Sequence, residues 1–141
     1  MVKSLKWMMM CGLVMALVAG CAGMGKKSDE ELIGETMAQF KAALEAKNID
    51  QIMTCVSEKF DHPEVGGKEE AKEMLQMGLD SGYADEGEVS LENMQITMND
   101  DGTASVYPVE ASSVQGSISV EVVLVKEGDK WLVSTINPDG M

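Results

Sequence analysis

The chain of 141 residues contains no arginine, one histidine and two residues each of tryptophan, tyrosine and phenylalanine. Its 11 lysines stand against 24 acidic residues. Nucleic-acid binding depends on clustered basic groups that contact phosphates, so we expect no nucleic acid as partner. His62 is one histidine among dispersed acids, and no phosphate-binding glycine loop is present. The sequence therefore predicts neither a metal site nor a cofactor.

The N-terminus has the order of features found in a secretory signal. Lys3 and Lys6 give a basic start, and the run from Trp7 to Gly20 is uncharged and ends in small residues. The four residues Val18-Ala19-Gly20-Cys21 resemble the lipobox of bacterial lipoproteins. That resemblance implies cleavage before Cys21 and lipid attachment to its thiol. Several acyl chains together give stable membrane anchoring.

An uncleaved membrane helix is the alternative interpretation. The uncharged run continues to Gly25 and approaches the roughly 20 residues that span a bilayer. The five glycine and alanine residues between Ala19 and Gly25 are poorly suited to a helix at a membrane interface. This favours the lipoprotein interpretation. Ala22 follows the cysteine where inner-membrane lipoproteins carry Asp, which implies the periplasmic face of the outer membrane in a host with two membranes.

We therefore expect a signal peptide at 1–20, a lipidated cysteine and tether at 21–27, and one domain at 28–141 in the cell envelope. Removal of 1–20 leaves nine lysines against 24 acids, a formal charge of −15. Anionic lipids repel such a domain, so the anchor has to hold it at the membrane. Cys55 is then the one thiol without lipid, and its apolar neighbours favour a buried core residue over a nucleophile.

Three amphipathic helices are predicted at the start of the domain. Ser28-Asp29-Glu30-Glu31 is a capping box, and apolar residues follow at helical spacing, which predicts a helix from Asp29 to Lys47. A second, short helix is capped by Asn48 and ends near Ser57. A third helix is predicted over residues 68–80.

In the C-terminal half the apolar residues recur every second position, which predicts strands. The expected strands are Met94–Met98, Thr103–Ala111, Ile118–Val125 and Trp131–Ile136, with Pro108 marking an edge or a bulge in the second. Three helices followed by an antiparallel meander predict an α+β fold in which the helices pack on one face of a curved antiparallel sheet.

Four short stretches add a family resemblance. They are the polar break Lys47-Asn48-Ile49-Asp50, the extended segment Ser57–Pro63 that ends in Asp61-His62-Pro63, the helix start Gly67–Ala71, and Gly128–Val133. In this order they resemble the nuclear transport factor 2-like superfamily, in particular its SnoaL-like bacterial members, although Asp and His are reversed relative to the usual triplet. The resemblance implies a cone-shaped domain with an apolar pocket between sheet and helices.

The expected pocket is lined from both layers of this fold. Its lining residues are Met37, Phe40, Met74, Met94, Ile96, Val120 and Trp131. Methionine adapts its shape and suits varied apolar ligands, although the same side chains also fill a core without any ligand.

Two functions agree with these features. The first is a lipid-anchored envelope protein with a non-catalytic domain that binds a small apolar ligand or a protein partner. The alternative is a SnoaL-like isomerase, cyclase or dehydratase, which needs a pocket carboxylate or histidine as base and a donor such as tyrosine. The candidates for these roles are Asp61, His62 and Tyr107, with Tyr83 and Glu110 as further ones.

A homodimer is also expected. Val123 and Val125 are apolar on the strand face opposite Val122 and Leu124. Members of the superfamily often dimerise through the outer face of the sheet, so the resemblance implies a weak dimer that involves these two residues.

Overall fold

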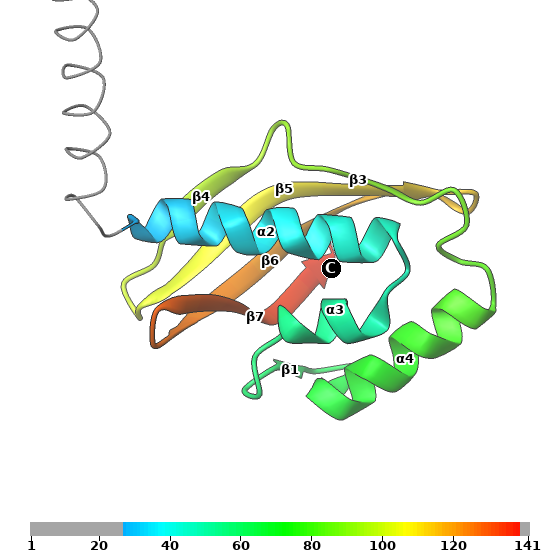
Figure 1. Ribbon diagram of the computed structural model, residues 1–141, viewed down its shortest axis with the longest axis horizontal. Coiled ribbons are helices and arrows are strands. Elements are labelled where there is room, and N and C mark those ends of the chain that lie inside the picture. The colour runs from blue at the N-terminus through cyan, green and yellow to red at the C-terminus, as the bar shows by residue number, and fades with distance from the viewer. Residues whose placement is uncertain (1–26, 139–141) are drawn as a thin grey trace, which may run out of the picture.

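The computed structural model describes residues 27–138 (Figure 1). Cys21 and the expected signal peptide lie outside the described residues. The helices and the small hairpin between them are α2 (Asp29–Glu45), α3 (Ile49–Thr54), β1 (Asp61–His62), β2 (Gly66–Gly67) and α4 (Lys68–Asp80). The main sheet contains β3 (Glu88–Ser90), β4 (Gln95–Met98), β5 (Thr103–Ser113), β6 (Gly116–Glu127) and β7 (Lys130–Pro138). Among the described residues, no helix has the length and apolar character needed to span a membrane.

The predicted caps start the first two helices. The Ser28 hydroxyl accepts the N–H of Glu31 at 3.2 Å, and the Asn48 side chain accepts the N–H of Gln51 at 3.2 Å. Each bond satisfies a backbone donor that the first helical turn leaves free. The first helix ends two residues before its predicted end, because Lys47 adopts a left-handed conformation with φ of 56° and turns the chain toward α3.

β5 is the central strand of the sheet. It pairs with β6 along one side and with both β3 and β4 along the other, and β7 follows β6. Its register with β6 shifts between Val106 and Val109, and the Tyr107–Pro108 peptide between them is cis. The bulge that Pro108 indicated is therefore present, in a central strand.

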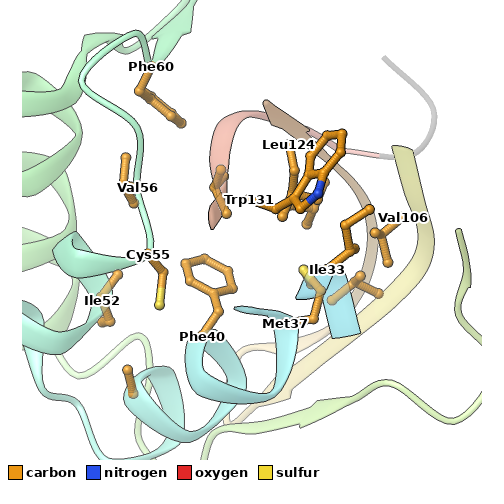
Figure 2. Close-up of a cluster of buried hydrophobic side chains, with 14 of the residues drawn as sticks. Ile33, Met37, Phe40, Ile52, Cys55, Val56, Phe60, Val106, Leu124 and Trp131 are labelled. Atoms are coloured by element: carbon orange, nitrogen blue, oxygen red, sulfur yellow. The ribbon is translucent and has the colours of Figure 1, made fainter. Parts of the chain in front are cut away.

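α2 crosses the concave face of this sheet, with α3 and α4 beside it (Figure 1). The predicted α+β architecture of three helices on a curved antiparallel sheet is confirmed. Apolar side chains from α2, α3, the segment after α3 and the strands converge on one core (Figure 2). The largest side chains that are completely enclosed include Trp131, Ile33, Met37, Ile52 and Leu124.

Trp131 joins the last strand to the first helix. Its side chain is 2% exposed, and its indole N–H donates to Asp29 Oδ1 at 3.2 Å. Its carbonyl accepts the hydroxyl of Thr36 at 2.7 Å, and Asp29 Oδ1 also accepts Lys126 Nζ at 2.9 Å. The first two turns of α2 are thereby fixed against the start of β7.

The outer edge of β7 is covered by the chain that follows α3. The N–H of Ser57 donates to the carbonyl of Val133, and the N–H of Val133 donates to the carbonyl of Cys55, both at 2.8 Å. These two bonds satisfy edge groups that would otherwise be open to another strand.

Candidate functional site

A groove of about 960 Å³ lies between the C-terminal half of α2 and the end of the sheet where β3, β5 and β6 meet. The helix contributes Ala38, Lys41, Ala42 and Glu45. The sheet side is lined by three short stretches, which are Glu88 to Glu92, Glu110 to Ser112 and Ser117 to Ser119. The groove thus combines small apolar side chains with carboxylates and hydroxyls.

Lys41 and Glu45 connect the helix to the edge strand in this groove. Lys41 Nζ donates to the carbonyl of Val89 at 2.6 Å, and the N–H of Val89 donates to Glu45 Oε2 at 3.1 Å. The two side chains also form an ion pair at 3.4 Å. The bond from the Val89 N–H, together with Lys41, holds the pKa of Glu45 below its ordinary value, against the opposing effect of burial. The helix thereby satisfies the outward-facing backbone groups of β3, as a neighbouring strand would do.

Strand register arranges the sheet side of the groove in rows across three strands. Glu110 of β5 lies between Ser90 of β3 and Ser119 of β6. Ser112 lies between Glu88 and Ser117 in the same way. Because successive side chains point to opposite faces of a strand, these two rows share the face of the sheet that is turned away from α2, since Val89 in the row between them is buried beneath the helix.

The intervening row is apolar and shares the helix-facing side of the sheet. It consists of Val89, Ala111 and Ile118. Val89 is buried beneath α2, whereas Ile118 is 48% exposed. The apolar strip therefore passes from the core into the open groove.

The charge of the groove is predominantly negative. Its lining residues include Glu45, Glu88, Glu92 and Glu110 against the single lysine Lys41, and the side chains of Glu88 and Glu110 point to the sheet face opposite α2. Since Lys41 is bonded to Val89 and paired with Glu45, the three other carboxylates have no lysine beside them among the lining residues. Such a surface favours partners with basic or hydrogen-bond-donating groups.

None of the seven residues predicted to line an apolar pocket belongs to this groove. Met37, Phe40 and Trp131 are buried in the core. Met94, Ile96 and Val120 are partly buried and pack against that core.

The prediction for Met74 is wrong, because this side chain is 60% exposed. α4 packs against α3 and β2 and buries Ala71, so the flank that carries Met74 faces outward. Met98, the last residue of the strand predicted from Met94, is 44% exposed at the end of β4.

The candidate catalytic residues lie on separate elements. Asp61 is exposed on β1, and the neighbouring His62 accepts the N–H of Glu64 through Nδ1 at 3.1 Å, in a local turn. Tyr107 is 43% exposed on β5, and Tyr83 is 61% exposed after α4. Glu110 alone among these candidates lines the groove.

Cys55 has the surroundings of a structural cysteine. Its side chain is 3% exposed in the core, and burial raises the pKa of its thiol, which disfavours the nucleophilic thiolate. Within residues 27–138, no group of three or more His, Cys, Asp or Glu side chains is arranged to hold a metal ion.

Sequence reasoning missed Lys41 and Glu45. Their spacing of four residues on an exposed helix flank is typical of a solvated ion pair. Their backbone partner, Val89, lies 44 residues or more along the chain, so no local pattern indicated the contact.

No protein-family model matches this chain, and no curated protein matches it in sequence. Solved structures match it over most of its length. A protein of unknown function with a cystatin-like fold from Nostoc punctiforme is 19% identical, with a TM-score of 0.63 over 78% of this chain and 89% of that chain. Aln2 from Streptomyces sp. is 16% identical, with a TM-score of 0.61 over 81% and 94%.

An uncharacterised protein with a cystatin-like fold from Caulobacter vibrioides is 10% identical, with a TM-score of 0.64 over 77% of this chain and 87% of that one. At such identities the likeness concerns the fold, and one fold of this kind serves many functions. The chain therefore has the nuclear transport factor 2-like, or cystatin-like, fold that its order of elements predicted.

Proposed function

We propose that this chain is a lipid-anchored cell-envelope protein whose domain binds a segment of a protein partner in the groove between α2 and β3, without catalysing a reaction. The anchor rests on the lipobox-like residues Val18 to Cys21 after an uncharged run. The binding role rests on one structural observation. Except for Met74, the apolar side chains expected around an internal pocket fill the core or pack against it, whereas an open groove of mixed polarity lies beside the edge strand.

The lining of the groove supports a protein partner over a small apolar ligand. Sites for small ligands are predominantly apolar with a few convergent polar groups. Here the lining residues include four glutamates and four serines besides small apolar residues. Protein interfaces combine an apolar centre with a polar rim, and the groove offers the exposed Ile118 on the sheet together with the polar side chains of Lys41 and Glu45 on α2.

The positions of the candidate bases support a non-catalytic domain. A SnoaL-like mechanism needs a base and a donor that face one reacting group. Asp61 and His62 lie on β1, which contacts β7, whereas Tyr107 lies on β5, and β6 separates β5 from β7 in the sheet. None of the three lines the groove. The SnoaL-like enzyme stays an alternative hypothesis that an activity retained by the wild type and lost in Asp61→Asn or His62→Gln would favour.

The anchor is tested by intact mass measurement of full-length protein expressed in a bacterial host. The expected wild-type mass is that of residues 21–141 with attached acyl chains. Cys21→Ser should leave an uncut precursor without lipid. A wild-type chain that begins at Met1 and carries no lipid would contradict the proposal.

The groove is tested by a photo-crosslinking residue at Ile118 in the lipidated protein in its host. The matched control is the same residue at Met77, which is 69% exposed on α4. A discrete protein adduct is expected at Ile118 and not at Met77. Ala42→Lys should weaken that adduct without unfolding the domain, because Ala42 lines the groove from α2 and its side chain is exposed.

Two other outcomes decide against a protein partner. Equal adducts at both positions would indicate encounters that are independent of the groove. An apolar small molecule that co-purifies with the wild type in native mass spectrometry, without an adduct at Ile118, would favour the small-ligand version of the function.

A further inference from the structure

The start of the described domain and the groove lie at opposite ends of the molecule. Asp29, at the beginning of α2, contacts Lys126 and Trp131, which flank the β6–β7 turn. Thr103 pairs with Val125, so the β4–β5 turn lies at this same end. Glu45, in the last turn of α2, contacts β3 at the other end, where the β5–β6 turn lies (Figure 1).

The dimensions of these elements separate the two ends clearly. α2 has 17 residues, which correspond to about 25 Å at 1.5 Å per residue. β6 has 12 residues, or about 40 Å along a strand. The tether is shorter, because the six peptide units from Cys21 to Lys27 span at most about 20 Å when fully extended.

The domain is fixed close to the point where the tether meets it. Lys27 Nζ pairs with Glu35, and Ser28 caps the first turn of α2. Asp29 is then held by Lys126 and by the Trp131 indole. A lipid on Cys21 is therefore connected by a short link to one end of a folded body, and that end cannot move far from the membrane surface.

The negative charge of the domain determines its orientation relative to the membrane. The chain after residue 20 has a formal charge of −15, and anionic headgroups repel it over a distance of about 8–10 Å at physiological salt. A domain lying flat would bring the groove acids within this distance. An upright domain presents only its attached end, which carries seven of the 24 acids, namely Asp29, Glu30, Glu31, Asp100, Asp101, Glu127 and Asp129, with Lys27, Lys126 and Lys130 beside them.

We infer that the end formed by the first turn of α2 and by the turns at residues 99–102 and 127–130 faces the lipid headgroups. The groove then opens away from the membrane. A partner reaches it from the aqueous compartment and not from the lipid layer. This inference rests on the proposed lipid anchor.

Energy transfer from labelled protein to acceptor lipids tests the orientation. Full-length lipidated protein carries one donor fluorophore on Asp100→Cys, at the attached end, or on Ser117→Cys, at the groove end. Both positions are exposed, whereas Cys55 is 3% exposed and the thiol of Cys21 is expected to be alkylated. The vesicles contain phosphatidylethanolamine, phosphatidylglycerol and a headgroup-labelled acceptor.

Transfer is expected to be several-fold greater from position 100 than from position 117. The difference should decrease in high salt and on phosphatidylcholine vesicles, because the repulsion that holds the domain upright is weaker there. Equal transfer from both positions, or greater transfer from position 117, would overturn the orientation while leaving the anchor intact. A preparation whose intact mass lacks lipid, and which stays free of the vesicles, would overturn both.

Discussion

The two flanks of α2 differ in burial, although they belong to one helix. One flank carries Ile33, Met37 and Phe40 and is buried against the centre of the sheet. The other carries Lys41 and Glu45 and borders the groove beside β3. The difference lies in what each flank faces.

At the centre of the sheet the backbone groups pair mainly with neighbouring strands, so the helix needs to supply only apolar surface. At the edge, the N–H and C=O of Val89 point away from β5 and need partners. Side chains that satisfy such groups keep the region polar and open. The comparison teaches that the open groove is located by an edge strand and not by an internal cavity.

The core beneath the buried flank of α2 should be far more sensitive to side-chain truncation than the outer surface of the domain. Trp131→Ala removes the largest enclosed side chain of the core and is expected to lower the free energy of unfolding by about 3–5 kcal/mol. Denaturant unfolding measures this loss. The control Met77→Ala, at an exposed position of α4, should change stability by less than about 0.5 kcal/mol. Similar losses for the two variants would refute the assignment of core and surface.

Acid should weaken the contact at the beginning of α2. The bonds from Lys126 and from the Trp131 indole hold the pKa of Asp29 below its ordinary value. A carboxylate with a lowered folded-state pKa contributes stability that is complete above its unfolded pKa, about 3.9, and is lost as pH falls through the folded value. Asp29→Asn should therefore be less stable than wild type near neutral pH, with a difference that shrinks below about pH 4.

Thermal unfolding over a series of pH values measures that difference. Glu73→Gln, at an exposed position of α4, serves as the control of equal charge change. A difference between Asp29→Asn and wild type that stays constant down to low pH would show that the carboxylate charge is not responsible.

A substitution on the flank of α2 that borders the groove should have only a local effect. Glu45→Ala removes the acceptor of the Val89 N–H, so hydrogen exchange at that amide should accelerate while the Val133 amide in the core stays protected. Glu92→Ala removes a groove acid of equal charge and should leave exchange at Val89 unchanged. An unaltered Val89 amide in Glu45→Ala would mean that the contact between helix and edge strand is not maintained in solution.

The smallest effect concerns the outer face of the sheet, where Val123 and Val125 are half-buried. The homodimer expected from the sequence is proposed to use this face. Val123→Lys should shift a weak dimer to monomer by placing a charge in an apolar interface, with little change in the fold. Analytical ultracentrifugation across a wide concentration range measures the shift, and a wild type that is monomeric throughout would rule out the dimer.

Sequence reasoning was accurate where the determining interactions are local. The caps at Ser28 and Asn48 and the helix over residues 68–80 were predicted from contacts three or four residues apart. The change of apolar period to two located the strands, and Pro108 indicated the bulge in β5. These features determined the fold class, since helices followed by an antiparallel meander have few ways to bury their apolar faces.

Only the tertiary structure decided which apolar faces are covered and where the groove lies. Helical spacing made Met74 equivalent to Met37, yet the first is 60% exposed and the second is enclosed, because α2 crosses the sheet whereas α4 packs against α3 and β2. The groove depends on contacts from Lys41 and Glu45 to Val89, more than 40 residues away. Spacing along a helix specifies which residues share a face, and only the packing of distant elements specifies what that face meets.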